Sequence, residues 1–66
     1  MNRPFTLADK IASVRREIVW RRKVYPGRVQ NGRMSTAKAQ REIACMEAIL
    51  ADLEAQQRQQ EPRRLL

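Results

Sequence analysis

The sequence predicts an all-α protein that folds as an antiparallel helical hairpin, with helices over about residues 6–25 and 35–57. In both segments, apolar residues recur at three-to-four-residue spacing, which places them on one face of a helix. Glycine and proline total five of the 66 residues, a content that suits helices better than strands or disorder. A connection of roughly ten residues lets the helices fold back on each other. Residues 1–66 should form one domain, with 58–66 as a frayed or disordered tail.

The first helix has a clear predicted start and end. Thr6 followed by Asp9 is typical of an N-cap with a carboxylate in the first turn, where it meets free backbone N–H groups and the positive end of the helix dipole. The residue before Pro26 is disfavoured in helical geometry, so the helix should end or kink near Tyr25. Gly27, Asn31 and Gly32 indicate a loop. The residues of this helix that should face the hairpin core are Leu7, Ile11, Val14 and Ile18.

Ser35 is the predicted N-cap of the second helix, whose apolar stripe ends where the chain becomes polar at Gln56. An antiparallel arrangement should pair Ile18 with Ile43 and Leu7 with Leu53. The same register brings two acidic residues of the second helix opposite two cations of the first. The expected core residues of the second helix are Ile43, Met46, Leu50 and Leu53, and the expected ion pairs join Glu42 and Glu47 to Arg15 and Arg16.

Chain length predicts that a second copy is needed. A chain of 66 residues removes only roughly 60% of its unfolded surface from water. Cys45 is the only cysteine and there is no histidine, so an intrachain disulfide is impossible and a metal site is not expected. Cys45 should be a small buried hydrophobe. We therefore expect a homodimeric four-helix assembly, paired along a stripe of small residues. That stripe is Ala44, Ala48, Ala51 and Ala55, although alanine also occurs on exposed helix faces because of its helix propensity.

Positive charge is concentrated in the first half of the chain. The net charge is +7, and residues 1–33 hold nine Lys or Arg against two acids, whereas residues 34–66 hold five against five. Trp20 lies nearly opposite the apolar stripe of the first helix, so it cannot be part of the hairpin core. Trp, Tyr and Arg are enriched at binding hot spots. The predicted partner-binding residues are Trp20, Arg21, Arg22, Lys23, Tyr25 and Arg28.

Composition also narrows the function classes. With no histidine, one cysteine and no Gly-rich phosphate loop, the usual catalytic arrangements cannot be assembled, so we expect no catalytic residues, no enzyme and no cofactor. Cations interrupt every apolar run, which predicts a cytoplasmic protein with no membrane partner. A protein-binding function is the main hypothesis. A small basic nucleic-acid-binding helical dimer is the alternative, because a basic stripe with aromatics is also typical of that class.

Residues 21–55, RRKVYPGRVQNGRMSTAKAQREIACMEAILADLEA, carry a resemblance to a known family. The segment resembles very small helical-hairpin proteins encoded by phages and prophages, the anti-quorum-sensing proteins among them, and the likeness extends over roughly residues 7–54. It implies a dimer of hairpins that acts in the bacterial host cytoplasm. It also implies that the chain binds and inhibits host proteins, with a LuxR-type quorum-sensing regulator and a pilus-assembly ATPase as expected partners. The residues that carry the likeness are Tyr25-Pro26, Val29, Gly32, Met34-Ser35, Glu42-Ile43, Met46 to Leu50 and Asp52-Leu53.

Overall fold

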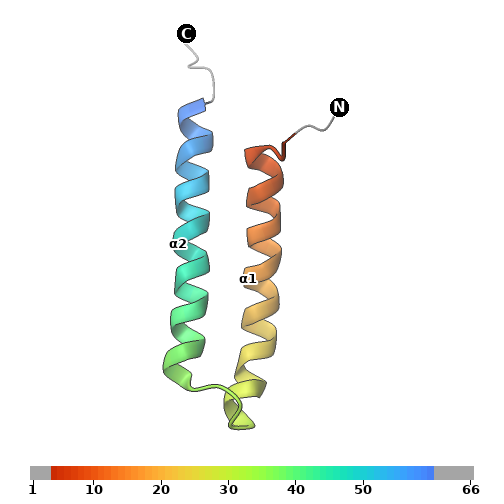
Figure 1. Cartoon of the computed structure of the whole chain (residues 1–66), viewed down its shortest axis with the longest axis vertical. Coiled ribbons are helices and arrows are strands. Elements are labelled where there is room, and N and C mark those ends of the chain that lie inside the picture. The colour runs from red at the N-terminus through yellow and green to blue at the C-terminus, as the bar shows by residue number, and fades with distance from the viewer. Residues whose placement is uncertain (1–3, 61–66) are drawn as a thin grey trace.

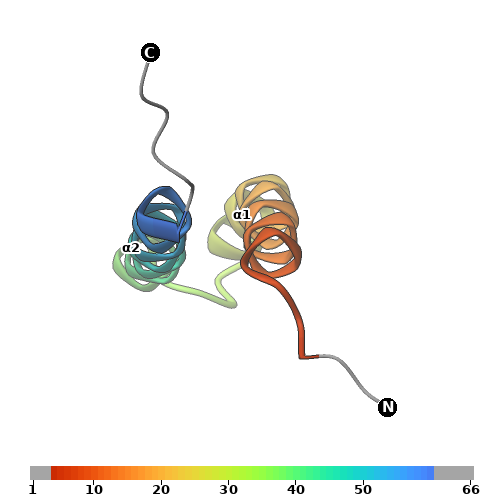
Figure 2. The ribbon, with the colours of Figure 1, turned by 90° about the horizontal axis from the view of Figure 1, so that it is seen from above.

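A computed structural model describes residues 4–60, which form two antiparallel helices joined by a short turn (Figure 1). α1 spans Leu7–Gln30 and α2 spans Thr36–Gln60. Seen along the helices, the two elements lie side by side in a single layer (Figure 2). The predicted helical hairpin is therefore confirmed. Residues 58–60 belong to α2 rather than to a frayed tail, and the rest of the expected tail lies outside the described residues.

Side chains cap the N-terminus of each helix. The Thr6 hydroxyl accepts from the Asp9 backbone N–H at 3.0 Å, and the Asp9 carboxylate accepts from the Thr6 N–H at 3.1 Å. This reciprocal pair is a capping box, which satisfies two backbone donors that have no partner within the helix. At the start of α2, the Lys38 N–H donates to the Ser35 hydroxyl at 3.0 Å. Both predicted N-caps are confirmed.

Of the two outcomes expected near Tyr25, an end or a kink, the end is wrong, because α1 continues through Pro26 to Gln30. Proline supplies no N–H, so the Arg22 carbonyl loses the donor that residue 26 provides in a regular helix. Two features offset that loss. Tyr25 is buried against α2, and the Asn31 N–H donates to the Gly27 carbonyl at 2.9 Å, which continues the helical bonding beyond the proline. Tertiary packing thus overrides the local preference of the residue that precedes proline.

Gly32 ends α1 and reverses the chain. Its φ is +74°, in the left-handed region that side chains with a Cβ rarely adopt. The Arg33 N–H donates to the Arg28 carbonyl at 2.9 Å, and the Gly32 N–H donates to the Val29 carbonyl at 3.1 Å. These two bonds form a Schellman motif, the usual way in which a glycine closes a helix.

The extra helical residues change the register of α1 against α2. The expected pairs of Glu42 and Glu47 with Arg15 and Arg16 are wrong. Instead, Arg21 bonds Glu42, and Arg22 pairs with Glu47. Arg15 pairs with Glu54 at 2.6 Å. The pairing is shifted in the same direction at the other end of the hairpin. There, Leu7 lines a hollow together with Gln56 and Gln60, which lie further along α2 than the predicted partner Leu53. The cause is the shorter connection, since α1 includes residues 26–30, five residues that the sequence predicts to lie in the loop.

The seam between α1 and α2 buries few side chains. Within residues 4–60, four hydrophobic residues are classed as buried, and no side chain is completely inaccessible. The buried residues are Ile11, Ile18, Tyr25 and Ala39, whereas Leu7, Val14, Ile43, Met46, Leu50 and Leu53 are half-buried. Cys45 is exposed, contrary to expectation, because it lies about 100° around α2 from the seam residue Met46.

The two glycines should respond in opposite directions to replacement by alanine. A Cβ at either position would meet no atom within 4 Å, so only backbone conformation separates them. Gly32→Ala should lower the free energy of unfolding by about 1 kcal/mol because of the positive φ. Gly27→Ala, inside α1, should raise it by about 0.5–1 kcal/mol.

Urea unfolding followed by circular dichroism at one chain concentration measures both changes. Equal effects of the two substitutions would contradict the assignment of Gly32 as the residue that ends α1.

Candidate protein-binding surface

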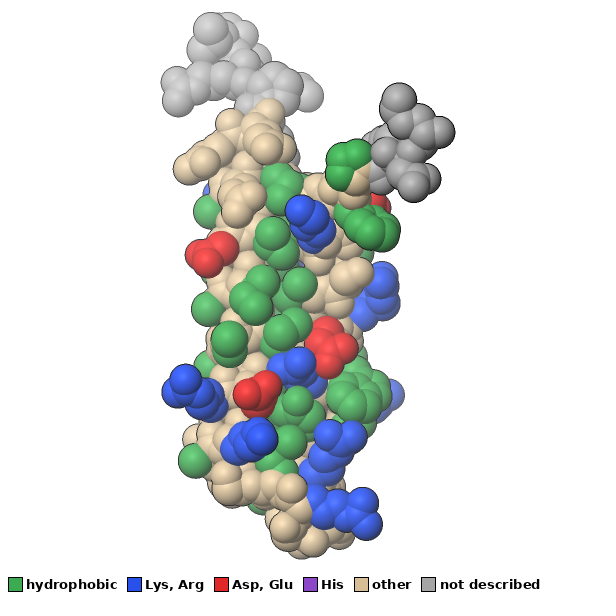
Figure 3. Space-filling view, viewed as in Figure 1, with side chains coloured by type: hydrophobic (Ala, Val, Ile, Leu, Met, Phe, Trp, Pro, Cys, Tyr) green, Lys and Arg blue, Asp and Glu red, His purple; other side chains and the backbone are tan. Residues whose placement is uncertain are grey.

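Cations gather at the end of the hairpin that contains the turn, which we call the closed end and define as residues 18–42. Between residues 18 and 41, all seven charged residues are Lys or Arg. Most cationic side chains on the face seen in Figure 3 lie toward the turn. Lys38 and Arg41 belong to α2, and the fold brings them to the same end as the cations of α1. In the folded chain, the excess of positive charge therefore lies mainly at the closed end. The sequence analysis did not identify Lys38 and Arg41 as part of this group.

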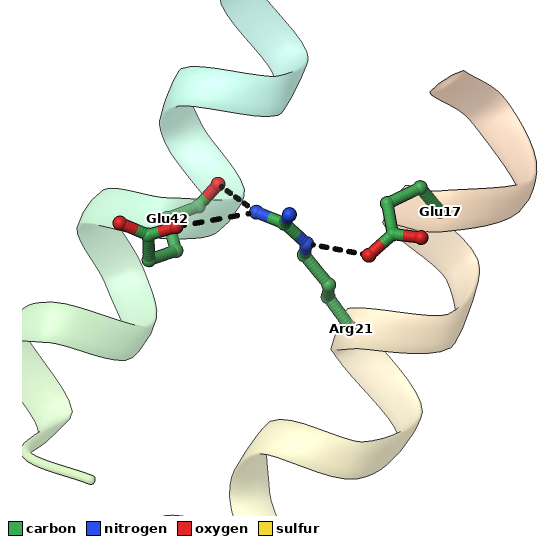
Figure 4. A network of polar contacts seen from close by, with 3 residues as sticks. All are labelled: Glu17, Arg21 and Glu42. Atoms are coloured by element: carbon green, nitrogen blue, oxygen red, sulfur yellow. Dashed lines mark hydrogen bonds and ion pairs between the residues drawn. The ribbon is translucent and has the colours of Figure 1, made fainter. Parts of the chain in front are cut away.

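Arg21 links the two helices inside this end (Figure 4). Its Nε donates to a Glu17 carboxylate oxygen at 2.9 Å. Its Nη1 donates to the Glu42 backbone carbonyl at 3.1 Å and to the Glu42 carboxylate at 3.4 Å. The hydrogen bond to Glu17 is the main cause that raises the pKa of Arg21 above its ordinary value. With a side chain only 20% exposed, Arg21 holds the hairpin together and has little surface left for a partner.

Trp20, Tyr25 and Arg28 form a second group, which we call the aromatic–arginine cluster. The Trp20 and Tyr25 rings meet edge to face, with centroids 6.5 Å apart and planes at 75°. The Arg28 guanidinium carbon lies 5.3 Å from the Trp20 centroid and 5.8 Å from the Tyr25 centroid. Trp20 remains 46% exposed. The cluster therefore presents one indole ring and one cation together, in a position set by the buried Tyr25.

The six predicted partner-binding residues fall into different environments. Trp20 and Arg28 are exposed together in the cluster, and Lys23 is exposed. Tyr25 is only 6% exposed, so it supports the cluster rather than offering surface of its own. Arg22 is exposed and pairs with Glu47 of α2. The structure thus brings Trp20, Tyr25 and Arg28 together and gives Arg21 and Arg22 intramolecular partners.

Three exposed hydrophobic residues were missed by the sequence reading. Phe5 is 77% exposed, Val19 64% and Ile49 41%. Val19 and Ile49 each lie next to a seam residue, at about 100° around their helix. Tracing the width of the apolar stripe, rather than only its centre, would have found both. On the face seen in Figure 3, hydrophobic side chains form a band along the seam.

Among residues 4–60, no group of His, Cys, Asp and Glu side chains is arranged to hold a metal ion. Neither α1 nor α2 contains a stretch that is long and apolar enough to cross a membrane.

Comparisons with protein-family models, with curated proteins and with solved structures gave no match to this chain. The resemblance to the small phage proteins therefore stays a prediction that rests on the residues quoted for it.

Arg21 and Arg22 are a matched pair for testing which cation holds the hairpin. Arg21→Lys should lower the free energy of unfolding by about 1–2 kcal/mol, because an ammonium cannot reproduce the fork that bonds Glu17 and Glu42. Arg22→Lys should change it by less than about 0.5 kcal/mol, since that side chain is 60% exposed and makes one surface ion pair.

Thermal and urea unfolding of both variants at one chain concentration provide the measurement. Equal losses in the two variants would show that Arg21 has no special role between the helices.

Proposed function

We propose that this chain is a protein-binding inhibitor rather than an enzyme, that it works as a homodimer, and that the aromatic–arginine cluster contacts the partner. The observation that carries the proposal is the half-exposed Trp20, held against Tyr25 and Arg28 at the cationic end of the hairpin. An exposed indole in a fixed position loses little conformational entropy on binding. Trp and Arg are also the residue types most often found at the energetic centre of interfaces.

The thin seam supports the homodimer. A single layer of two helices leaves the apolar band of Figure 3 partly open to water, and a second hairpin would cover such a surface. The proposed dimer stripe lies on the face of α2 opposite the seam and is a second candidate surface for pairing, because Ala44, Ala48 and Ala51 are exposed and Ala55 is half-buried. Helix propensity alone also explains exposed alanines. The stripe therefore stays a prediction for the interface of a four-helix assembly.

The charge of the closed end limits the kind of partner. Lys23, Arg28, Arg33, Lys38 and Arg41 make no ion pair within residues 4–60, so they attract an acidic surface. By its resemblance, the chain is phage-encoded and inhibits a LuxR-type regulator or a pilus-assembly ATPase in the bacterial host. The basic face with which a regulator grips DNA would repel this end. We therefore expect a contact with a regulator to avoid the regulator's DNA-binding face.

The same five cations favour a second candidate function, a small nucleic-acid-binding dimer. Phosphate contacts make log affinity fall linearly and steeply with log salt concentration, with little dependence on sequence. Contacts made through Trp20 depend less on salt, because burial of an indole is mainly apolar. Salt dependence therefore separates the two functions.

The test is capture of partners from bacterial lysate with tagged protein, with and without nuclease treatment. Under the protein-binding proposal, a stoichiometric host protein should survive nuclease. Trp20→Ala should weaken its capture at least tenfold, because removing a central indole costs about 2 kcal/mol or more. Val19→Ala is the matched control, because Val19 is the neighbouring exposed hydrophobic residue.

Two results would contradict the proposal. Bound material that disappears with nuclease would assign the cations to nucleic acid. Retention of the host protein by Trp20→Ala, with normal helix content, would remove the aromatic–arginine cluster from the interface.

A further inference from the structure

The seam between α1 and α2 has two faces. Arg21 bonds Glu42, whereas the next residue, Arg22, pairs with Glu47. Consecutive residues lie about 100° apart around α1, and residues five apart lie about 140° apart around α2. The two arginines therefore cross the seam on opposite sides. We call these sides the Arg21 face and the Arg22 face.

A step of seven residues shows how the two faces differ. Seven residues are nearly two turns, so the step stays on the same face and moves about 10 Å along the helix. On the Arg22 face, this step away from the turn leads to a second ion pair, Arg15 with Glu54. On the Arg21 face, it leads to Val14 and Ile49, the apolar pair, which lie at the same height because each is seven residues from one member of the bonded pair. In Figure 3, a hydrophobic band continues along the seam beyond a row of charged side chains, as expected for the Arg21 face.

The two faces differ in what a partner that excludes water would cover. On the Arg22 face, it would cover two ion pairs whose arginine side chains are 60% and 61% exposed, and the loss of that hydration is costly. On the Arg21 face, the arginine is only 20% exposed, so it has little hydration left to lose. Ile49 is 41% exposed and Val14 is half-buried. Burial of this hydrophobic surface is favourable, so such a partner fits the Arg21 face.

Charges on the Arg21 face match a second copy of the same face. Glu17, which bonds Arg21, and Lys10 are seven residues apart, so both lie on this face of α1. Lys10 is exposed and makes no ion pair within residues 4–60. Glu17 is 41% exposed and bonds Arg21 through one carboxylate oxygen, which leaves its second oxygen available within the described chain. A twofold axis at the height of Val14, midway between them, brings each Lys10 opposite Glu17 of the second copy.

The direction of pairing follows from the charges at the closed end. A twofold axis parallel to the helices would bring two closed ends together, each with five cations that make no ion pair within residues 4–60. An axis perpendicular to the helices places the closed ends far apart. Only this second arrangement lays α1 on α1 and α2 on α2 of the second copy, so only it permits the pairs of Lys10 with Glu17. Like-charge repulsion and ion pairing thus favour the same antiparallel dimer.

We propose that a second copy covers the Arg21 face in this antiparallel arrangement. The apolar pairs of the two copies form the centre of the interface, and two ion pairs of Lys10 with Glu17 flank it. The alanine stripe, on the far side of α2, stays outside. The inference rests on the homodimer of the proposed function and names its interface. It also places the two aromatic–arginine clusters near opposite ends of the dimer, so one dimer offers two sites to a partner.

The first test measures the dissociation constant of the dimer by analytical ultracentrifugation of the full chain. Ile49→Glu should raise the Kd at least about tenfold, because it brings two carboxylates together near the twofold axis. Two controls introduce the same charge on other surfaces. Val19→Glu lies on the Arg22 face and Ala48→Glu on the alanine stripe, and each should change the Kd less than about threefold. Circular dichroism of each variant verifies that the hairpin remains helical.

A second test changes the charge of Lys10. Lys10→Glu should raise the Kd at least about fivefold, because the new carboxylate faces Glu17 of the second copy. Arg16→Glu makes the same change of net charge at an exposed position about 120° around α1 from Lys10. This control should change the Kd less than about twofold, because a distant charge on the other side of the helix is screened by salt.

Disulfide trapping tests the arrangement of the two copies. In a Cys45→Ala background, Ile49→Cys should form a disulfide-linked dimer on oxidation, because residue 49 of each copy lies near the twofold axis and a disulfide needs close Cα atoms. Ala48→Cys in the same background should not form one, since it lies about 100° around α2 on the side away from the seam.

Three outcomes would overturn the proposal. A dimer that persists in Ile49→Glu, or that dissociates equally in Ala48→Glu, would leave the homodimer intact and remove the Arg21 face from its interface. A disulfide that joins Ile49→Cys chains to Val14→Cys chains, but not to each other, would show that the closed ends lie side by side. A monomer mass for the unmodified chain at all concentrations would contradict both this interface and the homodimer.

Discussion

The single seam between α1 and α2 is the contact on which the rest of this molecule depends. Two helices in one layer share one line of contact, and here that line buries Ile11, Ile18, Tyr25 and Ala39 among the described residues. Arg21 adds a polar bridge across the same seam. Everything outside this line is partly open to water, including the band of hydrophobic side chains in Figure 3. Such a thin core is the physical reason to expect a second hairpin.

Sequence reasoning predicted the helices and both N-caps because these features depend on local patterns. Helical spacing identified the seam residues, and Thr6 with Asp9 and Ser35 identified the starts. The register could not be predicted, because it depends on where α1 ends. A local rule ends α1 before Pro26, whereas burial of Tyr25 and the Schellman motif at Gly32 extend it to Gln30. Because the predicted helix end is wrong, the predicted register is wrong, and so are the ion pairs predicted between the two helices.

In the candidate sites too, some features follow from local sequence patterns, whereas others depend on how the two helices are arranged. The outward position of Trp20 follows from its angle on the first helix, so the sequence could predict it. Its contact with Arg28 could not be predicted, because the local preference of the residue before Pro26 ends the first helix before residue 28. The closed-end charge required the hairpin itself, which brings cations of α2 beside those of α1. The apolar pair of the Arg21 face required the register, because it depends on which residues of α2 lie opposite those of α1.

The measurement that tests the central claim most directly is the dependence of thermal unfolding on chain concentration, combined with the mass from sedimentation equilibrium. If two hairpins cover each other's exposed seam, the mass is that of a dimer. The midpoint then rises with concentration, because association stabilises the folded chain by mass action. A monomer mass over the whole range, with a midpoint that does not depend on concentration, would contradict the claim and leave this hairpin stable on its own seam.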